Sequence, residues 1–289
     1  MIAAATTTWN SSDIIGHALS HFEKLGFDRV YVMDFASEDG TPEILTSARW
    51  RQLVHLVPFP GLGNLDSSNI MLAIARQHEK PGWMLFCDPD EFLVTPGMGP
   101  VGDYLCATPA AALAVPRFNM TGRRTLCAGT GPDLFSFANF NLRIDRTAKR
   151  VAARDIAADL LDPPWIYSAM PGKIFTRIEC AGEIGPGDHG VTLLPGTETA
   201  PLKGFHLLHF PIRTYGEFES RTAMAARDFA ANPGLSQNYG WHARRWLRLR
   251  DQGMLRTEYL QQLVPDGEVE RLTADGILTI DNAIRNLHN

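Results

Sequence analysis

The sequence predicts an α/β fold in which helices flank a mostly parallel β-sheet, followed by a C-terminal helical region. Apolar runs of strand length alternate with amphipathic helical patterns as far as Val94. Their connections are long enough for the right-handed crossovers that join parallel strands. From Tyr215 onward the helical pattern prevails. We therefore expect a first domain over residues 1–212 and a helical region, packed on it, over residues 213–289.

The bulk properties are those of an ordinary globular protein, with 289 residues, 45% hydrophobic and 20% charged. A net charge of −5 excludes a global field that recruits nucleic acid. The start of the chain lacks a basic signal region, and no apolar run reaches the roughly 18 residues of a membrane span. We expect a cytoplasmic protein, with peripheral contact at the inner face of the membrane as an option. Four cysteines without C-x-x-C spacing are expected to be reduced thiols: Cys87, Cys106, Cys127 and Cys180.

The first part of the chain alternates strands and helices in order. Strands are expected at residues 2–8, 30–33, 53–57 and 83–87. Helices are expected at residues 14–25, from Thr41 onward, and at 66–77 with Ile70, Ala73 and Ile74 facing inward. The helix start at Thr41 is well marked, because a threonine N-cap precedes Pro42 at the first helical position.

Further along, the pattern is looser. Strands are expected at residues 111–118, 134–142, 173–177 and 205–210. Residues 173–177 alternate in polarity, which indicates an exposed-edge or half-buried strand. Helices are expected at residues 215–231 and 239–252.

An acidic cluster, Asp88-Pro89-Asp90-Glu91, ends the apolar run that begins at Trp83. A proline pushes the residue before it into extended geometry. In an extended segment Asp88 and Asp90 would lie on one face, with Cα atoms about 6.5–7 Å apart. Such a pair suits a Mg²⁺ or Mn²⁺ ion that also holds phosphate oxygens. The alternative is a solvated acidic loop after a strand.

Four polar residues follow the ends of the expected strands: Asn10, Asp34, Asp39 and Asp88. Ligands of parallel sheets bind at the carboxyl ends of the strands, around the point where strand order reverses. Each residue taken alone also has a structural explanation, as a helix cap, a turn former or a solvated loop. Together they predict a binding site at this edge of the sheet.

At these residues the chain resembles the family 2-type glycosyltransferases, in the bacterial branch with a D-x-D-E-F motif and a late H-Y/F-x-x-K/R motif. The resemblance is carried by Trp9-Asn10-Ser11, by Asp34-Phe35-Ala36-Ser37-x-Asp39-Gly40-Thr41, by Phe86 to Leu93, and by His209-Phe210-Pro211-Ile212-Arg213. It covers residues 5–95 and recurs over 171–215. One position departs from the family pattern, because relatives usually carry glutamate where this chain has Ser11.

The resemblance implies a GT-A fold, a Rossmann-like sheet over residues 1–212, and a nucleotide-sugar donor, with UDP favoured. A divalent cation, Mn²⁺ or Mg²⁺, would stabilise the charge that grows on the departing diphosphate. Asp88 would ligate this ion or hold the ribose, and Asp34 would face the base. Donor-binding residues are expected to be Thr8, Asn10, Asp34, Asp39, Asp88, Lys173 and Arg213. Metal ligands are expected to be Asp88, Asp90 and His209.

Each of the late residues has an alternative explanation. His209 is as well explained by a packed histidine at a strand end, and Lys173 and Arg213 by ordinary surface charge. An inverting transfer needs a base within hydrogen-bonding reach of the acceptor hydroxyl. The candidates are Asp188, Glu91 and Glu183, and Asp188 is favoured because it borders His189 in a glycine-rich loop.

On the acceptor side, His189 and Glu183 are expected to contact substrate, and His189 aligns with a histidine of the family. The predicted function is a metal-dependent glycosyltransferase of polysaccharide biosynthesis. It would move a sugar, with inversion, onto a glycan or lipid-linked acceptor.

Two rival functions and one further surface are open at this point. A nucleotidyltransferase would usually carry a glycine-rich loop after its first strand, whereas Gly61-Leu62-Gly63-Asn64 follows the third. An inactive nucleotide-sugar binder would explain Ser11. A basic helix could lie on anionic lipid or pack its aromatic side chains inward; it contains Trp241, Arg244, Arg245, Trp246, Arg248 and Arg250.

Overall fold

The computed structural model describes residues 1–61, 66–106, 108–128, 135–145, 161–236 and 239–288. They form two compact units. The first comprises Met1–Arg117, Pro171–Leu208 and Asn286–Asn289, and the second comprises Phe118–Met170 and His209–Arg285. These units divide the chain differently from the predicted boundary between residues 212 and 213. The predicted boundary separates a catalytic domain from a helical region, whereas the two units are defined by their internal contacts. The predicted boundary therefore stays a prediction. Leu62, Gly63 and Asn64 of the glycine-rich stretch lie outside the described residues.

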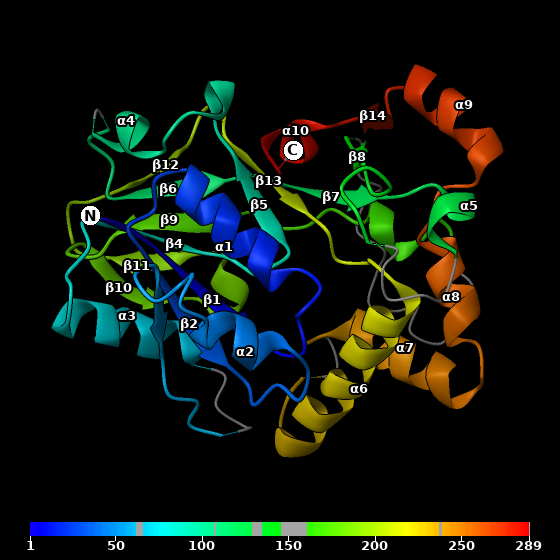
Figure 1. Ribbon diagram of the computed structural model, residues 1–289, viewed down its shortest axis with the longest axis horizontal. Coiled ribbons are helices and arrows are strands. Elements are labelled where there is room, and N and C mark those ends of the chain that lie inside the picture. Colours follow the sequence, from blue (N-terminus) through cyan, green and yellow to red (C-terminus); the bar gives the residue numbers. More distant parts are fainter. Residues whose placement is uncertain (62–65, 107, 129–134, 146–160, 237–238, 289) are drawn as a thin grey trace. The chain divides into compact units, whose positions relative to one another are not determined.

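A seven-stranded sheet organises the first unit, in the order β12-β6-β9-β4-β1-β2-β3 (Figure 1). Its strands are β1 (Ile2–Thr8), β2 (Arg29–Asp34), β3 (Val54–Leu56), β4 (Trp83–Phe86), β6 (Ala112–Val115), β9 (Lys173–Arg177) and β12 (Thr199–Pro201). Neighbours pair in parallel except where β9 is inserted antiparallel between β4 and β6. The predicted α/β fold with a mostly parallel sheet is therefore confirmed.

The strand order places a topological switch point between β1 and β4. The chain moves outward from β1 to β2 and β3, then returns to add β4 on the other side of β1. Ala5 of β1 is the register partner of both Tyr31 of β2 and Phe86 of β4, so the three strands are aligned. In open α/β sheets this is where ligands bind, beyond the carboxyl ends of the strands.

The first unit also contains the following helices and strands. They are α1 (Ile15–Lys24), α2 (Thr41–Thr46), α3 (Ser67–Gln77), α4 (Gly102–Leu105), β5 (Glu91–Val94), β10 (Ala181–Ile184), β11 (Val191–Leu193) and β13 (His206–His209), with short 3₁₀ turns η1 (Pro96–Met98) and η5 (Pro186–Asp188). β10 and β11 form an antiparallel hairpin.

Helix α3 covers one face of the sheet through a continuous apolar core. Its Met71, Leu72 and Ala75 pack with Ala3 and Ala5, whose small side chains leave room beside the helix. The helix itself confirms the prediction for residues 66–77, but its inward face differs from the predicted one. Ala73 is exposed, and Ile70 and Ile74 are only partly buried.

Several local expectations are wrong for identifiable reasons. Residues 173–177 form an interior strand rather than an exposed edge, because β9 is inserted between two neighbours. The strand expected at 111–118 is two strands, β6 and β7 (Arg117–Thr121), separated at Pro116, which cannot donate to a ladder. Among the described part of residues 134–142 only Leu142 is in a strand. Gly40, not Thr41, is the N-cap of α2, and the Thr41 hydroxyl instead accepts a hydrogen bond from the Ser11 N–H.

The second unit is largely helical, as predicted for the C-terminal region. Its elements are β7, α5 (Arg124–Cys127), β8 (Leu142–Ile144), η4 (Trp165–Tyr167), α6 (Tyr215–Ala231), α7 (Trp241–Asp251), α8 (Leu255–Gln261), η6 (Asp266–Glu268), α9 (Val269–Ala274), β14 (Leu278–Ile280) and α10 (Ala283–His288). The hydroxyl of Thr214 caps α6 by accepting the N–H of Glu217. β8 pairs antiparallel with β7 and with β14.

The basic helix α7 does not present all of its charges and tryptophans to one outer face. Arg245 and Trp246 are buried, and the Trp246 ring packs edge-on against Phe218 at a centroid distance of 4.7 Å. Arg244 stacks over Phe229. Arg245 and Trp246 therefore pack inward, as the alternative explanation has it. The hypothesis that the helix contacts lipid is wrong for these two residues. Within the described ranges, every helix is too short or too polar to cross a membrane.

A buried ion pair fixes α7 to α8 and yields a stability prediction. The Arg245 and Glu258 side chains are fully buried, with Nη2 and Oε2 2.8 Å apart, and Gln262 donates to the other carboxylate oxygen. The Glu258→Ala substitution removes the counter-charge of a buried guanidinium, so we expect a loss of about 3–5 kcal/mol in the free energy of unfolding. Urea denaturation measures it. The exposed Glu270→Ala variant is the control, and equal stability of the two variants would contradict the prediction.

Candidate functional site

The acidic cluster lies in a turn at the carboxyl end of β4, not in an extended segment as predicted. The N–H of Glu91 donates to the carbonyl of Asp88 at 3.1 Å, which closes a four-residue turn. Aspartate at the first position and proline at the second are typical of such a turn, and this local preference prevails over extension. Asp88 remains 42% exposed at its side chain, whereas Asp90 is buried.

Glu91 faces the interior and anchors the turn. Its side chain is fully buried, its Oε1 pairs with the guanidinium of Arg117, and its Oε2 accepts the Asp88 N–H at 2.9 Å. Burial raises the pKa of Glu91 to about 7, against the opposing attraction of Lys173 and Arg117. Both oxygens of the Glu91 carboxylate have partners, and the carboxylate is closed to solvent. Glu91 therefore stabilises the turn and is not accessible to an acceptor hydroxyl.

Lys173 is the hub of the cluster. Its ammonium lies 2.9 Å from Asp88 Oδ2, 3.5 Å from Glu91 Oε2 and 3.6 Å from Asp188 Oδ2, and it donates to the Gly187 carbonyl at 3.0 Å. Burial alone would lower the pKa of Lys173, but the three carboxylates outweigh it and raise the pKa. Burial acts to raise the pKa of Asp88, and the Lys173 charge reverses this and lowers it. Lys173 is therefore a buried counter-ion and not the surface charge of the alternative explanation.

Asp188 joins the cluster from the turn that follows β10. Its Oδ1 accepts a hydrogen bond from the Ser68 hydroxyl at 2.5 Å, and its side chain is 15% exposed. Burial raises the pKa of Asp188, with Lys173 opposing the shift. Of the three predicted bases, Asp188 therefore combines contact with the cluster and access to solvent. Glu183 is exposed on β10, where its backbone pairs with the Thr192 hydroxyl.

His189 lies against the same turn with a fixed ring orientation. Its Nδ1 is 2.9 Å from the Gly172 carbonyl, which can only accept, so Nδ1 carries the proton and Nε2 is an acceptor in the neutral ring. Burial lowers the pKa of His189 and favours that neutral form. A side chain on Gly187 would meet the ring at 2.7 Å, which accounts for the glycine.

The predicted nucleotide end is built by two loops that hold each other. The Asn10 N–H donates to the Ser37 hydroxyl, and its side-chain oxygen accepts the N–H of Glu38, both at 2.8 Å. Ser37 in turn donates to Asp34 at 2.5 Å. The Asp39 carboxylate accepts the N–H groups of Thr41 and Ser12, at 2.9 and 3.0 Å. Asn10, Asp34 and Asp39 are thus gathered at one edge as predicted, with their side chains also fixing the loops.

Thr8 ends β1 at the same edge. Its register partner is Asp34, and its hydroxyl is buried without a hydrogen-bond partner among the described residues. Burying a hydroxyl without a partner is costly, so this position suits a polar group of a bound molecule or a water.

His209 and Arg213 belong to the second unit. Their predicted roles, as a metal ligand for His209 and a donor contact for Arg213, stay predictions. His209 Nδ1 is 2.8 Å from the Asn119 side-chain oxygen. Arg213 is 1% exposed at its side chain and pairs with Glu217 at 3.1 Å. Both residues are buried. Surface charge, the alternative explanation for Arg213, is therefore wrong.

Two residues of the cluster were not singled out from the sequence, namely Arg117 and Ser68. Arg117 follows a proline between two strands, and Ser68 is one of two serines at a helix start. Neither pattern distinguishes a residue that reaches an acidic cluster from an ordinary polar residue. Across the described positions, no group of three or more His, Cys, Asp or Glu side chains surrounds a common metal position.

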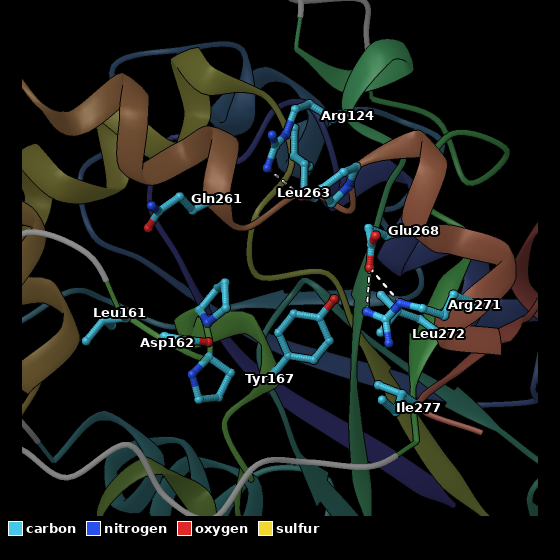
Figure 2. A pocket seen from close by; sticks show the side chains of 13 residues that line it. Arg124, Leu161, Asp162, Tyr167, Gln261, Leu263, Glu268, Arg271, Leu272 and Ile277 are labelled. Carbon is cyan, nitrogen blue, oxygen red and sulfur yellow. Dashed lines mark hydrogen bonds and ion pairs between the residues drawn. The ribbon is translucent and has the colours of Figure 1, made fainter. Parts of the chain in front are cut away.

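A separate cavity of about 700 Å³ lies within the second unit (Figure 2). Tyr167 and the Arg271–Glu268 ion pair line it together with apolar side chains that include Leu263, Leu272 and Ile277. None of the predicted site residues lines this cavity, so the cavity is not part of the predicted binding site.

No family model matches the chain, and no curated protein sequence matches it. Similar solved structures include S. aureus TarS 1-349 with UDP-GlcNAc, at 14% identity over 94% of this chain and 83% of that chain, with a TM-score of 0.42. The mannosyltransferase PcManGT from Pyrobaculum calidifontis, with GDP-Man and Mn²⁺, is 15% identical over 95% and 79%, with a TM-score of 0.36. Glucosyl-3-phosphoglycerate synthase from Mycobacterium tuberculosis, with Mn²⁺ and UDP, is 17% identical over 82% and 81%, with a TM-score of 0.37.

The raised pKa of Glu91 predicts a pH dependence of stability. The folded protein holds this proton more tightly than the unfolded chain, where the ordinary value is 4.5. The contribution of Glu91 is therefore complete below about pH 4.5 and is lost as the pH rises through about 7. The free energy of unfolding of wild type, minus that of Glu91→Gln, should fall between pH 4.5 and pH 8. Urea unfolding measures it, circular dichroism checks that both proteins are folded, and parallel pH curves would contradict it.

Proposed function

We propose that this protein is a metal-dependent glycosyltransferase that moves a sugar, with inversion, from a nucleotide donor to a hydroxyl of a glycan or lipid-linked acceptor. A UDP-sugar is the favoured donor. One observation carries the proposal. The Asp88–Glu91 turn and Asp188 meet on the Lys173 ammonium, beside the switch point of a mostly parallel sheet.

The charges of the cluster support a cation that binds together with a diphosphate. Its four carboxyl groups, of Asp88, Asp90, Glu91 and Asp188, outnumber its two cations, Lys173 and Arg117. The acids still exceed the cations when Glu91, with its pKa raised to about 7, is partly protonated near neutral pH. A divalent ion would offset this excess of negative charge and then attract the diphosphate. Hard divalent ions commonly take one or two carboxylates and leave their other positions to phosphate oxygens and water.

Asp88 and Asp90 would hold such an ion. Both follow β4, and the charge of Asp90 acts to raise the pKa of Asp88, so the two carboxylates lie within electrostatic reach of each other. When bound, the ion supplies a Lewis acid that stabilises negative charge on the departing diphosphate. The proposal needs only two protein carboxylates, so it agrees with the finding that no group of three or more potential ligands surrounds one position in the described residues.

The donor end is supported by the interlocked loops that follow β1 and β2. Asp34 is half-buried at the end of β2, where a carboxylate oxygen can accept the imide N–H of uracil. Thr8 is proposed as a further donor contact from the family resemblance. Because Asn10 and Asp39 fix the loop backbones, a donor would meet loops that are already ordered, which reduces the entropy lost on binding.

Asp188 is proposed as the base. In the transfer, the bond from the anomeric carbon to the diphosphate oxygen breaks, and a new bond forms from that carbon to the acceptor oxygen. The bonding pair leaves with the diphosphate, and the acceptor proton passes to Asp188. A raised pKa suits this task, because a base acts best when its pKa approaches the working pH.

The first experiment tests metal dependence. UDP should bind in calorimetric titration when Mn²⁺ is present, and binding should be lost after chelation or in the Asp90→Ala variant, because the diphosphate then faces uncompensated carboxylates. The exposed Asp103→Ala variant, on α4, is the matched control and should bind as wild type does. Equal binding of UDP with and without metal would contradict the metal assignment.

The second experiment tests the reaction and its base. UDP-glucose, UDP-galactose and UDP-N-acetylglucosamine are offered, and release of UDP is measured without added acceptor, so that water takes the sugar. Asp188→Asn should lower kcat by about 10²–10⁴-fold with unchanged UDP affinity. Glu179→Gln, at an exposed position after β9, is the control and should retain turnover. Binding without turnover would favour an inactive binder, and pyrophosphate release from a nucleoside triphosphate and a sugar phosphate would favour a nucleotidyltransferase.

A further inference from the structure

The backbone at Asp188 has a conformation that most residues avoid. Asp188 has a φ of 63° and follows Gly187 at 69°, so two successive residues are left-handed. This is ordinary for glycine but uncommon for a residue with a side chain. Such a residue persists only when its surroundings hold it, and sites of this kind cluster where function requires a fixed side chain.

The first turn of α3 supplies part of that hold through two neighbouring residues with different targets. The Asn69 side chain accepts the Ile184 N–H at 2.8 Å and donates to the Ile184 carbonyl at 3.1 Å. Asn69 therefore fastens the backbone that leads into the turn. Ser68 makes its contact with the carboxylate of Asp188 itself, at 2.5 Å from Oδ1.

The Asp188 carboxylate is thus bound from two elements at once. Ser68 approaches Oδ1 from α3, and the Lys173 ammonium lies 3.6 Å from Oδ2 on the side of β9. Two contacts at different oxygens fix the rotation of the carboxylate, which a single contact would leave free. The side chain is still 15% exposed, so an incoming hydroxyl can reach it.

We infer that Ser68 is a positioning residue of the reaction, whose hydroxyl orients Asp188 to take the proton of the acceptor. The inference rests on the proposed function and on Asp188 as the base. The hydroxyl donates to the carboxylate, so it also favours the ionised form that accepts a proton. Nothing in the pattern of the sequence marks Ser68 for this role, because its partner lies 120 residues away along the chain.

The test measures UDP release from the same three UDP-sugars, with water as acceptor, and UDP affinity by calorimetry in the presence of Mn²⁺. Ser68→Ala should lower kcat by about 10- to 100-fold with unchanged UDP affinity, because misplacement of a catalytic group lowers the rate while the donor contacts remain. Ser68→Thr, which restores a hydroxyl, should recover most of kcat. Asp188 lies in the loop between β10 and β11. Thr192→Ala removes a hydroxyl from β11 that does not contact Asp188, and this control should keep the wild-type kcat.

A purely structural role is distinguished by amide hydrogen exchange over residues 184–188. Protection in Ser68→Ala should match wild type, because Asn69 still holds Ile184. Loss of that protection would show that Ser68 only closes the loop and would overturn the inference.

The outcomes also separate this inference from the function on which it rests. No turnover of any donor by wild type would refute the transferase proposal. Full activity of Asp188→Asn would refute the base assignment, and the positioning role would be lost with it. Loss of activity in Asp188→Asn together with an unchanged kcat in Ser68→Ala would overturn the positioning role alone.

Discussion

The ammonium of Lys173, buried among carboxylates, is the interaction on which the arrangement of the site depends. Three acids from two segments approach it, namely Asp88 and Glu91 from one turn and Asp188 from another. Carboxylates brought this close repel each other, and burial adds to the cost of ionising them. A cation at their centre offsets both effects, and the Gly187 carbonyl completes its surroundings. The acids can therefore be held together before any ligand binds.

The same ammonium joins parts of the proposed reaction that would otherwise be independent. Asp88, the proposed metal and diphosphate residue, belongs to the turn after β4, and Asp188, the proposed base, belongs to the turn after β10. Because one residue contacts both, the distance between these turns is set by the position of β9 in the sheet. The antiparallel strand β9 within the mostly parallel sheet thus carries the residue that joins the two turns.

Much of the first unit could be predicted because its signals are local. β1 and α3 fall where periodicity, caps and breakers place them, and the polar residues after β1, β2 and β4 meet at one edge because parallel strands share a direction. The prediction from local sequence was wrong where two local conformational preferences of similar strength competed. Extension before Pro89 competed with the turn that aspartate and proline favour together, and the turn prevailed.

The sequence by itself determined the alternation of strands and helices, the edge at which Asn10, Asp34, Asp39 and Asp88 gather, and the chemical character of an acidic, oxygen-rich site. These follow from periodicity and from residue type, which are properties of neighbouring positions. Only the tertiary structure decided that Lys173 is interior, that Glu91 is closed off by Arg117, and that Ser68 reaches Asp188. Those contacts join residues 26 to 120 positions apart, and their partners are set by strand order and sheet register. The Asp88-Pro89-Asp90-Glu91 stretch contains the acids, but the fold supplies the cation that holds them together.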